Sequence, residues 1–204
     1  FYRNQLQLLS WRHEPARWLL KSPAHMPFLD RLLDVFDDAC VVQTHRDPAQ
    51  VLGSSCSLAA AASRPLVNRL DLHQVGASVL VRAEQAMSRL ERMRDRIEPG
   101  RVCDVRYDDL VADPVGTVRR IHAHFDLDLP ADMADRMRRW LADHPRHKHG
   151  RHRYSLEQFG LDRHEVDAVF APYVRRFGLR GDVSASTVSD RPVPLEAPAP
   201  RPGP

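Results

Sequence analysis

The chain of 204 residues is 43% hydrophobic and 28% charged, and this length and composition predict a single globular domain with a sizeable core. Its net charge of +3 argues against general nucleic-acid binding, which needs a basic face, and favours a small anionic ligand held by a few cations. No apolar run approaches the ~18 residues of a membrane span, and no secretory signal is visible, so we expect a cytoplasmic protein.

Strands and helices are expected to alternate along the chain, which predicts an α/β fold with a mainly parallel sheet. The chain opens with "FYRNQLQLL", already in a helical pattern and without methionine, which suggests a fragment. The expected strands are 16–22, 39–45 and 101–107, and the expected helices are 28–36, 47–62, 66–97, 113–125, 129–144 and 163–178. One domain over 1–182 is predicted, followed at 183–204 by a tail rich in Pro and Ala whose composition favours disorder.

The three cysteines, Cys40, Cys56 and Cys103, are widely spaced and odd in number. This spacing lacks the paired pattern of a zinc site, so we expect three buried thiols in a reducing compartment.

Arg46 follows the strand predicted at 39–45 and stands directly before the helix expected to begin at Asp47. In open α/β sheets, ligands bind beyond the carboxyl ends of the strands, where helix N-termini offer free N–H groups to anions. A guanidinium grips a phosphate with two hydrogen bonds, and Ser54, eight residues later, is placed to donate another. The alternative is a surface salt bridge of Arg46 with Asp47 or Asp109.

A second cation and hydroxyl stand in "LKSPAH" (20–25), at the end of the strand predicted for 16–22. Lys21 is a mobile positive charge, Ser22 a hydroxyl, and His25 a possible base near neutral pH. The alternative is a surface lysine beside a helix-capping serine. Two strand ends that both carry a cation and a hydroxyl favour a phosphate site.

In this order, "LKSPAH", "VVQTHRDPAQVLGSS" and "VRYDDLVADP" resemble the sulfotransferases that use PAPS (3'-phosphoadenosine-5'-phosphosulfate), particularly their bacterial branch. The resemblance covers roughly 1–178. It implies a three-layer α/β/α fold with a mainly parallel sheet, like that of the P-loop nucleotide kinases. It also implies PAPS as co-substrate, no metal, and a small-molecule or glycan acceptor with a hydroxyl or amine.

The same resemblance implies roles for individual residues. Arg46 and Ser54 would bind the 3'-phosphate, Tyr107 would lie beside the adenine, and Lys21 would lie near the transferring sulfuryl group. In many relatives the base is a histidine two residues after that lysine. Here that position is Pro23 and the nearest histidine is His25, so the base is His25 or a residue elsewhere.

Two further stretches depart from the family pattern. The family loop Pro-[Arg/Lys]-Ser-Gly-Thr-Thr, which binds the 5'-phosphosulfate, has no counterpart in this chain. The basic run at 144–160 stands where relatives close over the 3'-phosphate, so Lys148, Gly150 and Arg151 are candidate ligands. A flexible solvated loop and a histidine zinc site are the alternatives for this run.

Two other functions remain open from the residues alone. One is a fragment of a P-loop kinase or nucleotidase, and the other is a non-catalytic binding module. The acceptor and the oligomeric state carry no recognisable sequence signal.

Overall fold

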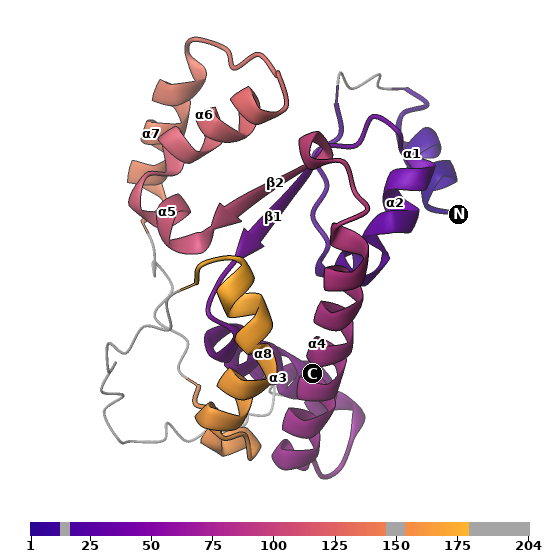
Figure 1. Ribbon diagram of the computed structural model, residues 1–204, viewed down its shortest axis with the longest axis vertical. Coiled ribbons are helices and arrows are strands. Elements are labelled where there is room, and N and C mark those ends of the chain that lie inside the picture. Colours follow the sequence, from indigo (N-terminus) through magenta and orange to yellow (C-terminus); the bar gives the residue numbers. More distant parts are fainter. Residues whose placement is uncertain (13–16, 146–153, 180–204) are drawn as a thin grey trace, which may run out of the picture.

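A computed structural model describes residues 1–12, 17–145 and 154–179. Two parallel strands lie at its centre, β1 (Val41–His45) and β2 (Val102–Arg106), with Val41 opposite Val102 and His45 opposite Arg106 (Figure 1). The long crossover between them is helical, as parallel pairing requires. The sequence therefore predicts these two strands and their parallel pairing correctly.

Helices surround the strands. The α-helices of the described part are α1 (Tyr2–Leu9), α2 (Leu29–Val35), α3 (Pro48–Ser63), α4 (Leu72–Arg94), α5 (Tyr107–Ala112), α6 (Pro114–His124), α7 (Met133–Asp143) and α8 (Arg163–Arg176). Short 3-10 turns complete them: η1 (Pro23–Phe28), η2 (Arg64–Leu66), η3 (Pro99–Arg101) and η4 (Glu157–Phe159).

Aspartates begin four of these helices. Asp47, Asp71, Asp113 and Asp162 each accept a hydrogen bond from a backbone N–H in the first turn, at α3, α4, α6 and α8 respectively. Such caps satisfy N–H groups that have no partner within the helix. This explains why α4 begins at Leu72 rather than at 66 as predicted.

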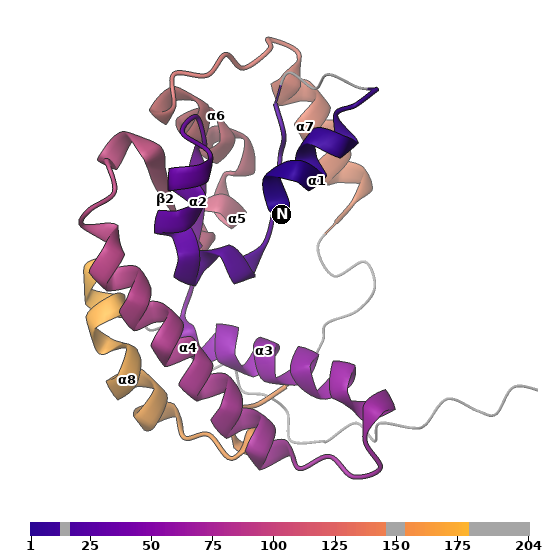
Figure 2. The ribbon, with the colours of Figure 1, turned by 90° about the vertical axis from the view of Figure 1, so that its right-hand side faces the viewer.

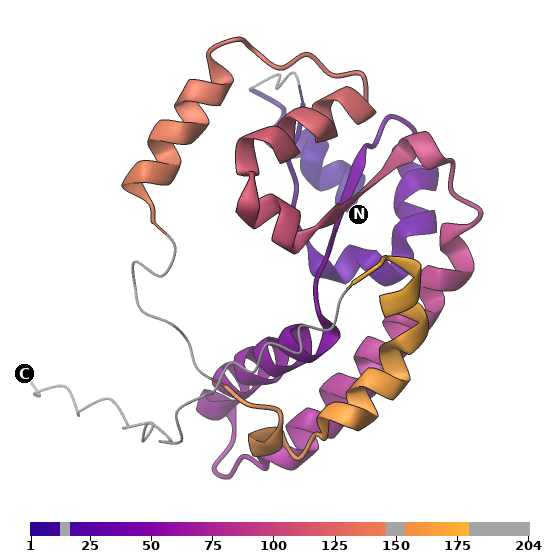
Figure 3. The same cartoon turned by 60° about the vertical axis from the view of Figure 1, so that its left-hand side comes forward.

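Two apolar cores hold the helices together. The larger lies among α3, α4, η4 and α8, where Cys56 and Val166 are fully buried, and Figure 2 shows α8 lying along α4. The smaller joins α2, the end of α4 and β2 around Leu90. Figure 3 shows α7 standing apart from α3, α4 and α8.

The strand predicted at 16–22 is wrong. Residues 17–22 form no strand, and Leu19 is 99% exposed. A strand persists only where a neighbouring strand satisfies its backbone groups, and this segment pairs with neither β1 nor β2. Lys21 therefore stands before the 3-10 turn η1 and not at a strand end.

The prediction of three buried thiols is also wrong. Cys56 is buried in the core of α3, but Cys40 is exposed in the connection before β1 and Cys103 is half-buried. On β2, Cys103 lies on the same face as the buried Val105, but it is nearer the start of the strand and is only partly covered.

The tail predicted at 183–204 lies outside the described residues, so its order stays a prediction. Within the described ranges, no helix is long and apolar enough to cross a membrane.

Gly76 allows α4 to touch η4 closely. A Cβ atom at this position would lie 2.1 Å from the carbonyl oxygen of Phe159. We expect Gly76→Ala to lower the free energy of unfolding by about 2 kcal/mol, because backbone must shift to relieve the overlap. Urea denaturation measures this change. The control is Gly100→Ala, where a Cβ meets nothing within 4 Å and the expected change is below about 0.5 kcal/mol. An equally small change at Gly76 would show that α4 and η4 are not packed this closely.

Candidate functional site

Parallel pairing brings Arg46 and Tyr107 together. His45 and Arg106 are opposite each other at the ends of β1 and β2, so the next residue of each chain segment lies at the same edge. The Arg46 Cζ atom lies 4.4 Å from the centre of the Tyr107 ring, in cation–π geometry. The resemblance named these two residues separately, and the structure places them side by side.

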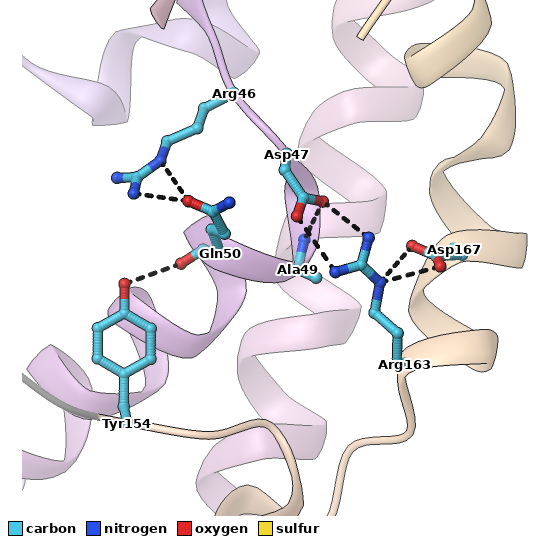
Figure 4. A network of polar contacts seen from close by, with 7 residues as sticks. All are labelled: Arg46, Asp47, Ala49, Gln50, Tyr154, Arg163 and Asp167. Carbon is cyan, nitrogen blue, oxygen red and sulfur yellow. Dashed lines mark hydrogen bonds and ion pairs between the residues drawn. The ribbon is translucent and has the colours of Figure 1, made fainter. Parts of the chain in front are cut away.

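The Arg46 side chain is held by a neutral partner. Its Nε and Nη2 atoms donate to Gln50 Oε1 at 3.0 and 2.7 Å (Figure 4). Ser54 follows Gln50 by one turn of α3, so these two exposed residues share a face of the helix, and the half-buried Arg46 just before the helix reaches Gln50. The guanidinium keeps its positive charge available to an anion at the N-terminus of α3.

The salt bridge considered for Arg46 is not formed. Asp47 instead caps α3 by accepting from Ala49 N at 3.1 Å and pairs with Arg163 at 3.2 Å. Figure 4 shows Arg46 and Arg163 on opposite sides of Asp47. Among the ion pairs within the described ranges, none joins Arg46 to Asp109 either.

The segment with Lys21 and His25 is exposed. Lys21 and Ser22 are solvent-exposed, and Ser22 precedes η1 without a side-chain capping bond. The His25 ring is half-buried, with its centre 5.2 Å from that of Tyr2. No hydrogen bond in the described part of the chain joins Lys21 or His25 to Arg46.

Lys148, Gly150 and Arg151 lie outside the described residues, and their predicted role stays a prediction. Tyr154, which follows them, is held against α3. Its hydroxyl donates to the Gln50 carbonyl oxygen at 3.3 Å, and a Cβ atom at Gly53 would lie 2.6 Å from its ring. The chain therefore returns to α3 one turn from Arg46.

A polar network centred on the buried His45 lies behind this edge of the sheet. His45 is 1% exposed, its Nε2 lies 2.9 Å from Asp104 Oδ1, and its Nδ1 lies 3.0 Å from the Tyr173 hydroxyl. Arg94 Nη2 donates to Asp104 Oδ2 at 2.7 Å. The His45 ring also stacks on Phe177, with 3.8 Å between ring centres.

The protonation states of Tyr173 and Asp104 decide which groups of the His45 network donate hydrogen bonds. Burial raises the pKa of Tyr173 to about 12, and a hydrogen bond with the Arg46 backbone partly opposes this, so the phenol stays protonated. For Asp104, burial favours the neutral acid, but the hydrogen bond with His45 and the charge of Arg94 prevail and lower its pKa. An ionised carboxylate only accepts, so in the neutral imidazole Nε2–H donates to Asp104 while Nδ1 accepts from Tyr173.

The lowered pKa of Asp104 links stability to pH. Because the folded-state value is below the unfolded value of about 4, the ionised carboxyl stabilises the fold above that pH, and this contribution is lost as the pH falls below it.

A cavity of about 270 Å³ lies beside Asp47, on the side where Arg163 lies and away from Arg46 (Figure 4). It is lined in part by Arg163, Asp167 and Arg175. Its Arg163 is already paired with Asp47 and Asp167. Arg46, by contrast, is held by the neutral Gln50.

The model of the sulfotransferase family matches residues 1–131. This chain belongs to the sulfotransferase family. Membership confirms the resemblance and decides against the kinase or nucleotidase interpretation.

Curated relatives and solved structures agree. The chain is 31% identical over 166 residues to the omega-hydroxy-beta-dihydromenaquinone-9 sulfotransferase Stf3 of Mycobacterium bovis and to that of Mycobacterium tuberculosis. Each alignment covers 78% of this chain and 40% of the relative. It is similar to the crystal structure of sulfotransferase STF9 from Mycobacterium avium, with a TM-score of 0.77 and 33% identity over 86% of this chain and 45% of that one. For sulfotransferase STF1 of Mycobacterium tuberculosis H37Rv the TM-score is 0.64 and the identity 35%, over 76% and 40%.

These sulfotransferases are longer proteins, and this chain spans less than half the length of each of them. The matches show the sulfotransferase fold, here as a mostly helical chain with a two-stranded parallel sheet in its described part.

The histidine zinc site has no support within the described residues. His144 stacks on Trp140, with 4.4 Å between ring centres, and the other three histidines of that run lie outside the described ranges. In the part of the chain that the structure describes, no three His, Cys, Asp or Glu residues converge in a metal-binding group.

Several site residues were missed from the sequence. Gln50 carries a detectable signal, because it lies four residues from Arg46 at the start of a predicted helix. His45 is a polar residue at the end of a short apolar strand, and such a residue is buried only with partners, here Asp104 and Tyr173. Nothing local marks Arg163 or Tyr173, since their partners are distant in the sequence.

Proposed function

We propose that this protein is a PAPS-dependent sulfotransferase that moves a sulfuryl group to a hydroxyl or amine of an acceptor. The observation that carries this proposal is Arg46, a cation at the carboxyl edge of the sheet, held by neutral Gln50 and by the Tyr107 ring. The family supports the reaction class, and we infer the complete three-layer architecture from its structural relatives.

Arg46 and Ser54 would bind the 3'-phosphate of PAPS. The guanidinium offers a planar pair of donors for two phosphate oxygens, and the exposed Ser54 hydroxyl adds one more donor on the same helix face. The first turn of α3 contributes its N-terminal dipole. The Tyr107 ring, beside Arg46, would contact the adenine.

PAPS would supply the activated sulfuryl group. Lys21 would neutralise the negative charge that develops on the leaving phosphate, and this positioning of charge is the main contribution to such in-line transfers. His25 would remove the proton from the acceptor. Lys148, Gly150 and Arg151 would close over the 3'-phosphate.

The acceptor is proposed to be a small molecule with a free hydroxyl. The names of two relatives give an omega-hydroxy quinone as their substrate. A glycan or an amine is the alternative acceptor.

Calorimetric titration with two nucleotides tests the proposed site. We expect adenosine 3',5'-bisphosphate to bind much more tightly than adenosine 5'-monophosphate, because only the first carries the 3'-phosphate that Arg46 recognises. Equal affinity for the two nucleotides would remove the phosphate site from Arg46.

Lys21→Ala is expected to lower kcat by about 100-fold, the usual effect of losing one electrostatic stabiliser of a transition state. Transfer of radiolabelled sulfate from PAPS to a long-chain primary alcohol measures it. Adenosine 3',5'-bisphosphate affinity should change much less. The matched control is Arg17→Ala, which removes another exposed cation from the same segment. An unchanged kcat in Lys21→Ala would remove Lys21 from the reaction. His25→Ala should also lower kcat, because His25 is proposed to take the acceptor proton.

A further inference from the structure

We propose that helix α8 positions Arg46 for its ligand by holding both of its neighbours in the chain, His45 and Asp47. This inference rests on the proposed phosphate site at Arg46. It assigns Tyr173 and Arg163 as positioning residues, which act through the backbone and touch no ligand. The segment matched by the family model ends at residue 131, so α8 lies outside it.

Tyr173 holds the residue before Arg46. Its hydroxyl lies 3.0 Å from His45 Nδ1. A hydrogen bond with the Arg46 backbone acts to lower the pKa of the same hydroxyl. His45 is 1% exposed and stacks on Phe177, directly after α8. Because a buried imidazole with two hydrogen bonds and a stacked ring has little freedom, the end of β1 is fixed in one position.

Arg163 holds the residue after Arg46. Its Nη1 and Nη2 atoms lie 3.2 and 3.4 Å from the two carboxylate oxygens of Asp47, in the forked geometry that fixes orientation as well as distance. The Asp47 side chain is 9% exposed, and Asp167 in turn holds Arg163 Nε at 2.9 Å from both carboxylate oxygens. The first turn of α3 is therefore fixed to the first turn of α8.

These two contacts leave the Arg46 side chain open. Tyr173 and Arg163 are ten residues apart on α8, and neither touches the guanidinium, which points away from Arg163 toward Gln50 (Figure 4). Helix α8 thus sets the direction in which Arg46 leaves the backbone without occupying its donors. Phosphate recognition with two parallel hydrogen bonds depends on that direction.

Two variants remove one contact each. Tyr173→Phe keeps the ring and removes the hydroxyl, and Arg163→Gln removes the charged fork. Each is expected to lower the preference for adenosine 3',5'-bisphosphate over adenosine 5'-monophosphate by about fivefold, the equivalent of one hydrogen bond. Arg163→Lys should recover part of the preference. A general loss of folded protein weakens both nucleotides equally and leaves this ratio unchanged.

The control is Asp95→Asn, which breaks the ion pair between Arg176 of α8 and the end of α4 and removes no contact of His45 or Asp47. This variant should keep the wild-type preference for adenosine 3',5'-bisphosphate over adenosine 5'-monophosphate. Amide hydrogen exchange gives a readout without ligand: exchange over residues 46–50 should rise in Tyr173→Phe and Arg163→Gln but not in the control.

The outcomes separate the two proposals. A wild-type protein without preference for the bisphosphate would overturn the proposed function. A wild-type preference that persists in both variants, with unchanged exchange over residues 46–50, would overturn the role of α8 alone.

Discussion

Arg46→Ala is expected to weaken the binding of adenosine 3',5'-bisphosphate by about 30- to 1,000-fold, or about 2–4 kcal/mol, in isothermal titration calorimetry. The loss is large because the guanidinium stands at this edge of the sheet and because Gln50 and Tyr107 hold it in place before any ligand arrives. Binding of adenosine 5'-monophosphate should change little.

Two further variants sharpen this result. Arg46→Lys keeps the charge but loses the planar fork and the contact with Gln50, so it should recover only part of the affinity. Arg64→Ala removes an exposed arginine at the opposite end of α3 and serves as the control for overall charge. If Arg64→Ala and Arg46→Ala weaken binding equally, the effect is long-range electrostatics and not recognition by Arg46.

His45→Ala is expected to lower the free energy of unfolding by about 3 kcal/mol. The substitution removes both hydrogen bonds of a fully buried ring and its stacking on Phe177, and the buried Tyr173 hydroxyl loses its imidazole partner. Urea denaturation at neutral pH measures the change.

The matched control for this stability change is Thr44→Ala, because Thr44 precedes His45 on β1 with an exposed side chain. It should change stability by less than about 0.5 kcal/mol. His45→Gln should recover part of the loss, since an amide both donates and accepts. A change in His45→Ala no larger than the control would mean that the network contributes nothing to the fold.

Much of the phosphate-site hypothesis follows from short stretches of sequence. The position of Arg46 between a strand and a helix is predicted because a short apolar run precedes it and because Asp47 and Pro48 begin a helix. Caps and prolines act within one turn, so their effects are readable without tertiary information. The same reasoning placed β2 and the start of α6 correctly.

The apolar run at 17–22 shows where such reasoning fails. Its composition is that of a strand, yet Leu19 is 99% exposed and the run pairs with neither strand. Pairing depends on a neighbour, and composition alone does not supply one. The predicted burial of Cys103 failed for a related reason: Cys103 shares a face of β2 with the buried Val105, and packing decides which positions along that face are covered.

Local sequence by itself determined that Arg46 stands at a strand end before a capped helix, with Ser54 on that helix. Only the tertiary structure decided that Asp47 pairs with Arg163 rather than with Arg46, and that Tyr173 holds His45. These contacts join residues 116 and 128 positions apart in the chain. No local pattern encodes such pairs, because each depends on how α8 packs against α3 and α4, and that packing is set by apolar burial over the whole core.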